Sequence, residues 1–292
     1  MRLLPLAALL LATSAFSLPA AAEEQDETPI VVTGVKDRKE QIQSFVGALT
    51  VAPPGGQIGR YETPICPAVL GMPEARKLAV EKRLRAVAGA IGLETGAADC
   101  LPNLLVMVTR DKGDFMKIIR KDYPDFFQGL EPVQISRIQK QPGSASAWQV
   151  ELLLDADGRP ILLDNDGSVD GPTNGGSIRP PSRIQEAQRP SIMAAAVVVE
   201  ADALQGLSTT QLADYAAMRS FARADPARLP ADAPDTILRV IDAPAGTALP
   251  VTLTEWDFAF LKALHATPKN ARASQQRIAI ASALEKELDR GP

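Results

Sequence analysis

The two cysteines, Cys66 and Cys100, place the strongest constraint on how this chain can fold. With two cysteines in 292 residues, a single disulfide pairing exists. Neither cysteine belongs to a C-x-x-C motif, which argues against a redox pair, and two free thiols are the alternative. In an oxidising compartment we expect the pair to form a bridge, which would stabilise the fold by on the order of 3 to 4 kcal/mol.

The N-terminal residues are typical of a secretory signal peptide. Arg2 supplies the positive start, an apolar run covers residues 3–18, and small residues follow before Glu23. The run is shorter than the roughly 20 apolar residues that a membrane anchor needs. We therefore expect residues 1–22 to be removed. The mature protein would be exported to the periplasm or beyond the cell, without a transmembrane segment.

Composition narrows the possible functions. Acidic residues outnumber basic ones by 35 to 31, so the chain has no overall positive charge with which to bind nucleic acid. The single histidine, His265, limits both zinc sites and catalytic triads. The chain also contains no H-E-x-x-H, G-x-S-x-G or phosphate-binding glycine motif. The sequence thus predicts no catalytic residue, no metal ligand and no cofactor.

Helical and strand patterns are interspersed along the chain. Apolar residues recur at helical spacing over 80–91, and capping boxes at Ser208 and Thr254 open two further helices. The other predicted elements are helices over 114–121 and 274–289 and strands over 30–33, 104–108, 150–154, 161–163, 194–199 and 237–241. Because no steady βαβ alternation emerges, we predict an α+β fold in which a mixed sheet of short strands packs with several helices.

The distribution of proline, glycine and polar residues predicts the domain organisation. Residues 23–72 are expected to form an extended, Pro- and Gly-rich segment, and residues 73–292 a single α+β domain. Within that domain, the polar stretch 164–190 is predicted to be a long loop that is either functional or flexible. The motif IVVTG at 30–34 resembles the mature start of many TonB-dependent outer-membrane receptors, which implies a Gram-negative envelope.

Two groups of charged residues have both a structural and a functional interpretation. The first predicted helix carries five basic residues on its outer side, which indicate a solvated surface or a contact for an acidic partner: Arg76, Lys77, Lys82, Arg83 and Arg85. The acidic clusters at 155–158 and 164–167 indicate turns, since Asp, Asn and Gly suit turn conformations. Weak Ca²⁺ binding is the alternative for these clusters.

Two segments carry a family resemblance: 207–215 (LSTTQLADY) and 253–264 (LTEWDFAFLKAL). The order of predicted elements over about residues 70–266 resembles secreted bacterial proteins of metzincin-like architecture. The second segment is similar to the S/T-E-x-D-x-x-x-L-x-x-L that follows the active helix in some of them. The resemblance implies a degenerate zincin-like domain. Because the first segment lacks the motif's histidines, no family ligand is carried over and a pseudo-enzyme is implied.

The leading interpretation is therefore a non-catalytic envelope protein that binds another envelope protein or a small ligand. The alternative is a secreted or periplasmic hydrolase that uses carboxylates alone, or His265 with a serine, in a cleft beside the helix at 208–222. We expect His265 to interact with the last carbonyls of its own helix, which ends before Pro268, or to be exposed. A buried imidazole beside a serine would instead support the hydrolase.

Overall fold

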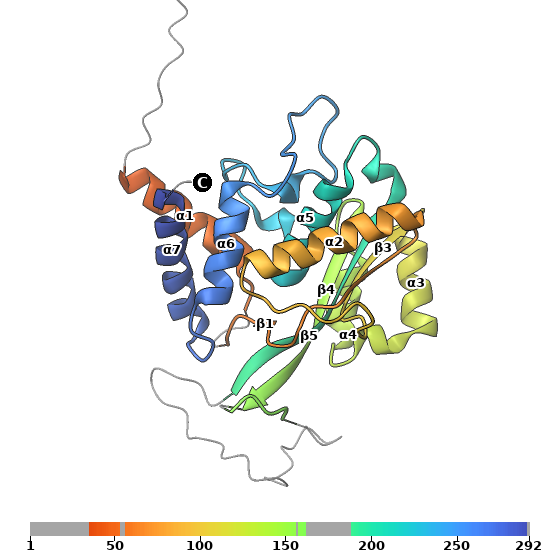
Figure 1. Cartoon of the computed structure of the whole chain (residues 1–292), viewed down its shortest axis with the longest axis horizontal. Coiled ribbons are helices and arrows are strands. Elements are labelled where there is room, and N and C mark those ends of the chain that lie inside the picture. The colour runs from red at the N-terminus through yellow and green to blue at the C-terminus, as the bar shows by residue number, and fades with distance from the viewer. Residues whose placement is uncertain (1–34, 53–55, 156, 162–187, 291–292) are drawn as a thin grey trace, which may run out of the picture. The chain divides into compact units, whose positions relative to one another are not determined.

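The computed structural model describes residues 35–52, 56–155, 157–161 and 188–290, which belong to one compact unit (Figure 1). Five sequence predictions lie wholly or mostly outside the described residues: the signal peptide (1–22), the strand and motif at 30–34, the strand at 161–163, the acidic cluster at 164–167 and the loop at 164–190.

The described strands form one mixed sheet. In chain order they are β1 (Arg60–Tyr61), β2 (Pro67–Leu70), β3 (Leu104–Thr109), β4 (Ala145–Asp155) and β5 (Gln188–Glu200). The N-terminal part of β5 pairs with β1 and its C-terminal part with β3, both in parallel, and β2 lies parallel beyond β3. Strand β4 runs antiparallel along the other side of β5. This arrangement confirms the predicted α+β fold, although β4 and β5 are longer than expected.

Seven α-helices accompany the sheet in the described part of the chain. They are α1 (Val35–Leu49), α2 (Glu74–Ala90), α3 (Lys112–Asp122), α4 (Pro132–Gln139), α5 (Thr209–Phe221), α6 (Glu255–Ala266) and α7 (Ala273–Arg290). The capping boxes predicted for α5 and α6 are confirmed: the side chain of Ser208 accepts from Gln211 N–H, and that of Thr254 accepts from Asp257 N–H.

Helices cover both faces of the sheet. Successive side chains of a strand point to opposite faces, so Val197 and Val199 of β5 belong to one hydrophobic cluster and Val198 to another. On β4, Ala147 and Trp148 divide in the same way. The larger cluster also contains residues of α1, α2, α5, α6 and α7, whereas α3 and α4 supply the smaller one (Figure 1).

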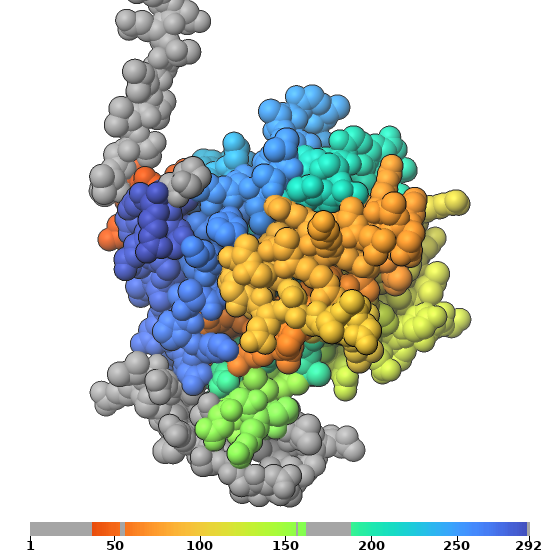
Figure 2. All heavy atoms as spheres, viewed as in Figure 1, coloured from red at the N-terminus to blue at the C-terminus, as the bar shows by residue number. Residues whose placement is uncertain are grey.

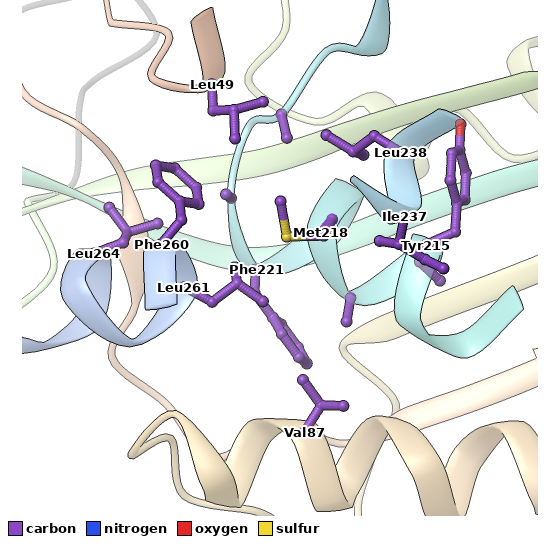
Figure 3. Packing of buried hydrophobic residues seen from close by; sticks show 14 of the residues in the cluster. Leu49, Val87, Tyr215, Met218, Phe221, Ile237, Leu238, Phe260, Leu261 and Leu264 are labelled. Carbon is purple, nitrogen blue, oxygen red and sulfur yellow. The ribbon is translucent and has the colours of Figure 1, made fainter. Parts of the chain in front are cut away.

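The centre of the larger cluster forms where α5 meets α2 and α6. Figure 3 shows Phe221 of α5 pointing toward Val87 of α2, while Phe260 and Leu264 of α6 lie to the left of Met218 in this view. All of these side chains are at least 97% buried. Burying a large apolar side chain contributes about 1.5 to 3 kcal/mol, so this junction holds α5 firmly between its neighbours.

The extended segment predicted for 23–72 is wrong over residues 35–49, because these residues form α1. Four buried side chains of α1 recur at helical spacing: Ile42, Phe45, Val46 and Leu49. Phe45 makes edge-to-face contacts with Trp256 and Phe260, whose ring centroids lie 5.4 and 6.0 Å away. The compact unit therefore begins at Val35 and not at residue 73.

The predicted strand at 237–241 is also wrong, since residues Ile237–Arg239 form a 3-10 turn. The hydroxyl of Thr236 caps this turn by accepting from Leu238 N–H. Asp257 accepts from Ile237 N–H at 2.8 Å and from the Thr236 hydroxyl. Because a side-chain carboxylate supplies these acceptors, the segment needs no neighbouring strand.

The disulfide between Cys66 and Cys100 is confirmed, with the Cα atoms 6.0 Å apart. It joins the residue before β2 to the loop before β3, and thus links the two ends of the connection that contains α2. No helix in the described part of the chain is long and apolar enough to span the hydrocarbon core of a bilayer.

Candidate functional site

A cleft of about 1020 Å³ follows the outer side of β4. One wall comes from α4 and the loop before it, including Leu130, Gln134 and Arg137. The opposite wall comes from the segment after α1 and from the C-terminal end of α5 with the residues that follow, including Arg219 and Arg223. The cleft combines apolar side chains with convergent polar groups, as ligand sites commonly do.

Three arginines line this cleft in a chain whose net charge is −4. Arg137 is exposed, and its side chain makes no hydrogen bond or ion pair with any described residue. Arg219 is 5% exposed and donates to the Tyr215 hydroxyl and to Gln141 Oε1, whereas its buried Nε has no partner among the described groups. Arg223 forms an ion pair with Glu151.

Glu151 is the acidic group on the β4 side of the cleft. Its Oε2 accepts from Arg223 at 3.2 Å, while its buried Oε1 has no partner in the described part of the chain. Burial raises the pKa of this carboxyl, and the nearby Arg223 offsets part of that increase. Gly59 makes room for it, because a Cβ atom there would lie 2.1 Å from Glu151 Oε1.

Gln149 connects β4 to the end of α5. Its side-chain amide donates to the carbonyls of Arg219 at 2.6 Å and of Ala222 at 3.2 Å. These carbonyls close the C-terminal end of α5, where helix geometry leaves acceptors unpaired. The contact therefore holds Arg219 and Arg223 at a defined position relative to the strand.

A second cleft, of about 610 Å³, adjoins the first. The two share Gln141, Arg219 and Asp225 as lining residues. The hydrogen bonds from Arg219 to Tyr215 and Gln141 run along this shared wall. Arg219 thus contributes to both hollows.

No family model, curated protein or solved structure matches this chain. The resemblance to metzincin-like proteins therefore stays a prediction. In the two segments that carry this resemblance, 207–215 and 253–264, the buried aspartates make hydrogen bonds that stabilise the fold. Asp214 accepts from Arg83, Thr252 and Leu253 N–H, and Asp257 accepts from Thr254 N–H in the capping box of α6. Among the described residues, no group of three or more His, Cys, Asp or Glu side chains could hold a metal ion.

His265 lies in the last turn of α6, as predicted, but the contact expected for it is wrong. Its Nε2 lies 3.2 Å from the carbonyl of Phe221 on α5, and its buried Nδ1 has no partner in the described chain. Burial lowers the pKa of the imidazole to about 3, and the positive charge of Arg60 acts in the same direction. His265 is therefore neutral and is not hydrogen-bonded to a described serine.

Arg60 has the role that the sequence suggested for His265. Its guanidinium donates to the carbonyls of Leu264, Thr267 and Pro268 at 2.6 to 2.8 Å. These acceptors lie at and just beyond the C-terminal end of α6, where a cation is favourable. A residue of β1, distant in sequence, thus caps this helix.

Several of the other charged groups singled out by the sequence have structural contacts in the described part of the chain. In the turn at 155–158, Asp155 Oδ1 accepts from the N–H groups of Asp157 and Arg159. On α2, whose outer side is orange in Figure 2, Arg83 binds Asp214 and Arg85 donates to the Gly96 carbonyl. Two of the five basic residues predicted to be solvated thus support the fold.

Sequence reasoning missed the arginines and the glutamate of the cleft. Two signals were present. Glu151 interrupts the apolar run 150–154, and Arg219 directly follows the apolar run 215–218 of α5. A charged residue inside a buried pattern indicates a paired or functional group, because an isolated buried charge is costly.

Proposed function

We propose that this chain is an exported envelope protein that binds an anionic, partly apolar ligand in the cleft beside β4, without catalysing a reaction. The observation that carries the proposal is the convergence of Arg137, Arg219 and Arg223 on one cleft of an acidic chain. Guanidinium groups are well suited to carboxylates and other oxyanions because they donate in a fixed planar geometry. Apolar residues such as Leu130 and Leu152 supply the remaining contacts.

The export part of the proposal is supported by the signal-like N-terminus and by the disulfide. Disulfides persist mainly in oxidising compartments such as the periplasm. The IVVTG motif favours a Gram-negative envelope.

Binding of anilinonaphthalene sulfonate to the native protein tests the ligand site. This fluorescent probe carries an anionic group on aromatic rings. We expect saturable binding that weakens with added salt. Arg137→Glu should weaken it at least fivefold, because the variant reverses an unpaired charge in the cleft. Lys121→Glu is the matched control, since Lys121 is exposed on α3 and does not line the cleft. No binding, or equal effects of both variants, would contradict the proposal.

A hydrolase that uses Glu151 as a general acid is the second candidate. The observation in its favour is the raised pKa of this carboxyl in a cleft that also contains Asp225. Perturbed carboxyl groups of this kind occur in acid–base catalysis. A panel of nitrophenyl glycosides and esters provides the test. Turnover by the wild-type protein that is lost in Glu151→Gln would favour the hydrolase. An absence of turnover by the wild-type protein would contradict it.

A further inference from the structure

Backbone groups on the outer edge of β4 point into the cleft. In an antiparallel strand, alternate residues direct their N–H and C=O groups to opposite edges. Ala147 points outward, since its N–H donates to Gln141 Oε1 at 2.9 Å and its carbonyl accepts from Gln141 Nε2 at 2.8 Å. Gln149 and Glu151 follow at two-residue intervals on the same strand and therefore point the same way.

The open part of this edge has defined ends. At the end nearer the start of β4, the side-chain amide of Gln141 pairs with the backbone N–H and C=O of Ala147. At the other end, Asp155 N–H donates to the Arg159 carbonyl and Leu153 C=O accepts from Ile161 N–H. Between them, no described group bonds to the outward N–H and C=O of Gln149 or Glu151. Such an edge can accept a further strand.

We propose that the ligand of the cleft is an extended peptide with acidic side chains, which adds a strand to β4 at Gln149 and Glu151. This inference rests on the proposed function and names its ligand class. Strand addition would pair the open backbone groups, a mode by which several domains bind peptides. Side chains of the added strand would alternate between the two walls, where Arg137 lies on one side and Arg223 on the other.

Charge favours an acidic peptide over a second copy of this chain. The charged residues that line the cleft are three arginines and two carboxylates, Glu151 and Asp225, so a copy paired through its own β4 edge would set one net positive cleft against another. Like charges placed together across an interface oppose association. Aspartate or glutamate side chains would instead meet these cations with opposite charge.

The probe is a fluorescent, end-capped hexapeptide that alternates valine with aspartate. A second peptide replaces aspartate by lysine. Two further peptides have the aspartate sequence with N-methylated backbone amides. One is methylated at every valine and the other at every aspartate. We expect the aspartate peptide to bind at least tenfold more tightly than the lysine peptide. At least one N-methylated peptide should lose tenfold or more, because methylation removes the donors that pair with β4. Equal binding of all four would overturn the inference.

Hydrogen exchange locates the peptide on the full-length protein. Adding the aspartate peptide should slow exchange of the amides of Gln149 and Glu151 at least tenfold. Arg137→Glu should weaken peptide binding, whereas Lys121→Glu should not. Peptide binding without protection of these two amides would overturn strand addition. Protection that rises with protein concentration in the absence of peptide would overturn it in favour of a second copy.

The sulfonate probe separates the two proposals. If that probe binds in an Arg137-dependent manner and none of the peptides binds, the peptide inference is wrong and the proposed ligand site stands. If neither probe binds, both proposals are wrong.

Discussion

Arg83 on α2 donates two hydrogen bonds, 2.7 and 2.9 Å long, to the carboxylate of Asp214 on α5. Asp214 is fully buried, whereas the Arg83 side chain is 35% exposed. The carboxylate also accepts from the Thr252 hydroxyl and from Leu253 N–H, and Arg83 donates to the same hydroxyl. One ion pair therefore joins α2, α5 and the segment before α6.

We expect Arg83→Met to lower the free energy of unfolding by about 2 to 4 kcal/mol, because it leaves a buried carboxylate without its cation. The partial exposure of Arg83 places the estimate at the lower end of the range for buried pairs. Arg76→Met is the matched control: Arg76 is exposed on the same helix, and its side chain has no described partner. Urea unfolding measures both variants. A loss below about 0.5 kcal/mol for Arg83→Met would show that the pair does not stabilise the fold.

The lowered pKa of His265 predicts how the stability of the fold depends on pH. Burial lowers its folded-state pKa to about 3, below the usual 6.5, so the folded protein binds fewer protons than the unfolded chain between these values. Stability should therefore fall as pH decreases from 6.5 toward 3, by up to about 1.4 kcal/mol per pH unit from this group. His265→Gln keeps a donor for the Phe221 carbonyl and removes the titration. Its acid-unfolding midpoint should lie at lower pH, and an unchanged midpoint would contradict the prediction.

The disulfide leads to two predictions, one for the covalent link between the cysteines and one for the free energy of unfolding. Mass spectrometry of the exported protein without reductant should show a peptide that links Cys66 to Cys100. Free alkylated thiols would contradict this pairing. A Cys66→Ser, Cys100→Ser double variant should lose about 2 to 4 kcal/mol, since the bridge restricts the unfolded chain. Thermal unfolding of the wild-type protein with and without reductant checks the same quantity independently.

Glu151 predicts that binding of an anion depends on pH. Its pKa is raised by burial, and its ionisation places a negative charge in the cleft beside Arg223. Affinity for the sulfonate probe should therefore decrease as pH rises through this pKa, while the sulfonate itself stays charged. Glu151→Gln should bind more tightly at neutral pH and lose the pH dependence. Identical pH profiles for the two proteins would show that the anion binds away from this carboxyl.

Patterns within single segments were sufficient to predict much of the fold. Helix α2 was predicted from apolar spacing, and α5 and α6 from their capping boxes. These signals depend on contacts within one or two turns. Prediction was wrong at 237–241, where Asp257 of a later helix supplies the hydrogen bonds that keep a β-capable segment out of a sheet.

The sequence by itself determined the α+β character, the single disulfide pairing and the shortage of imidazole and thiol groups, because composition, spacing and capping are local properties. Only the tertiary structure decided where charges meet. It places Arg60 at the end of α6, buries His265 against α5, and brings Arg137, Arg219 and Glu151 to one cleft. These contacts join residues from separate helices and strands, and their positions follow from how the two hydrophobic clusters pack on opposite faces of one sheet.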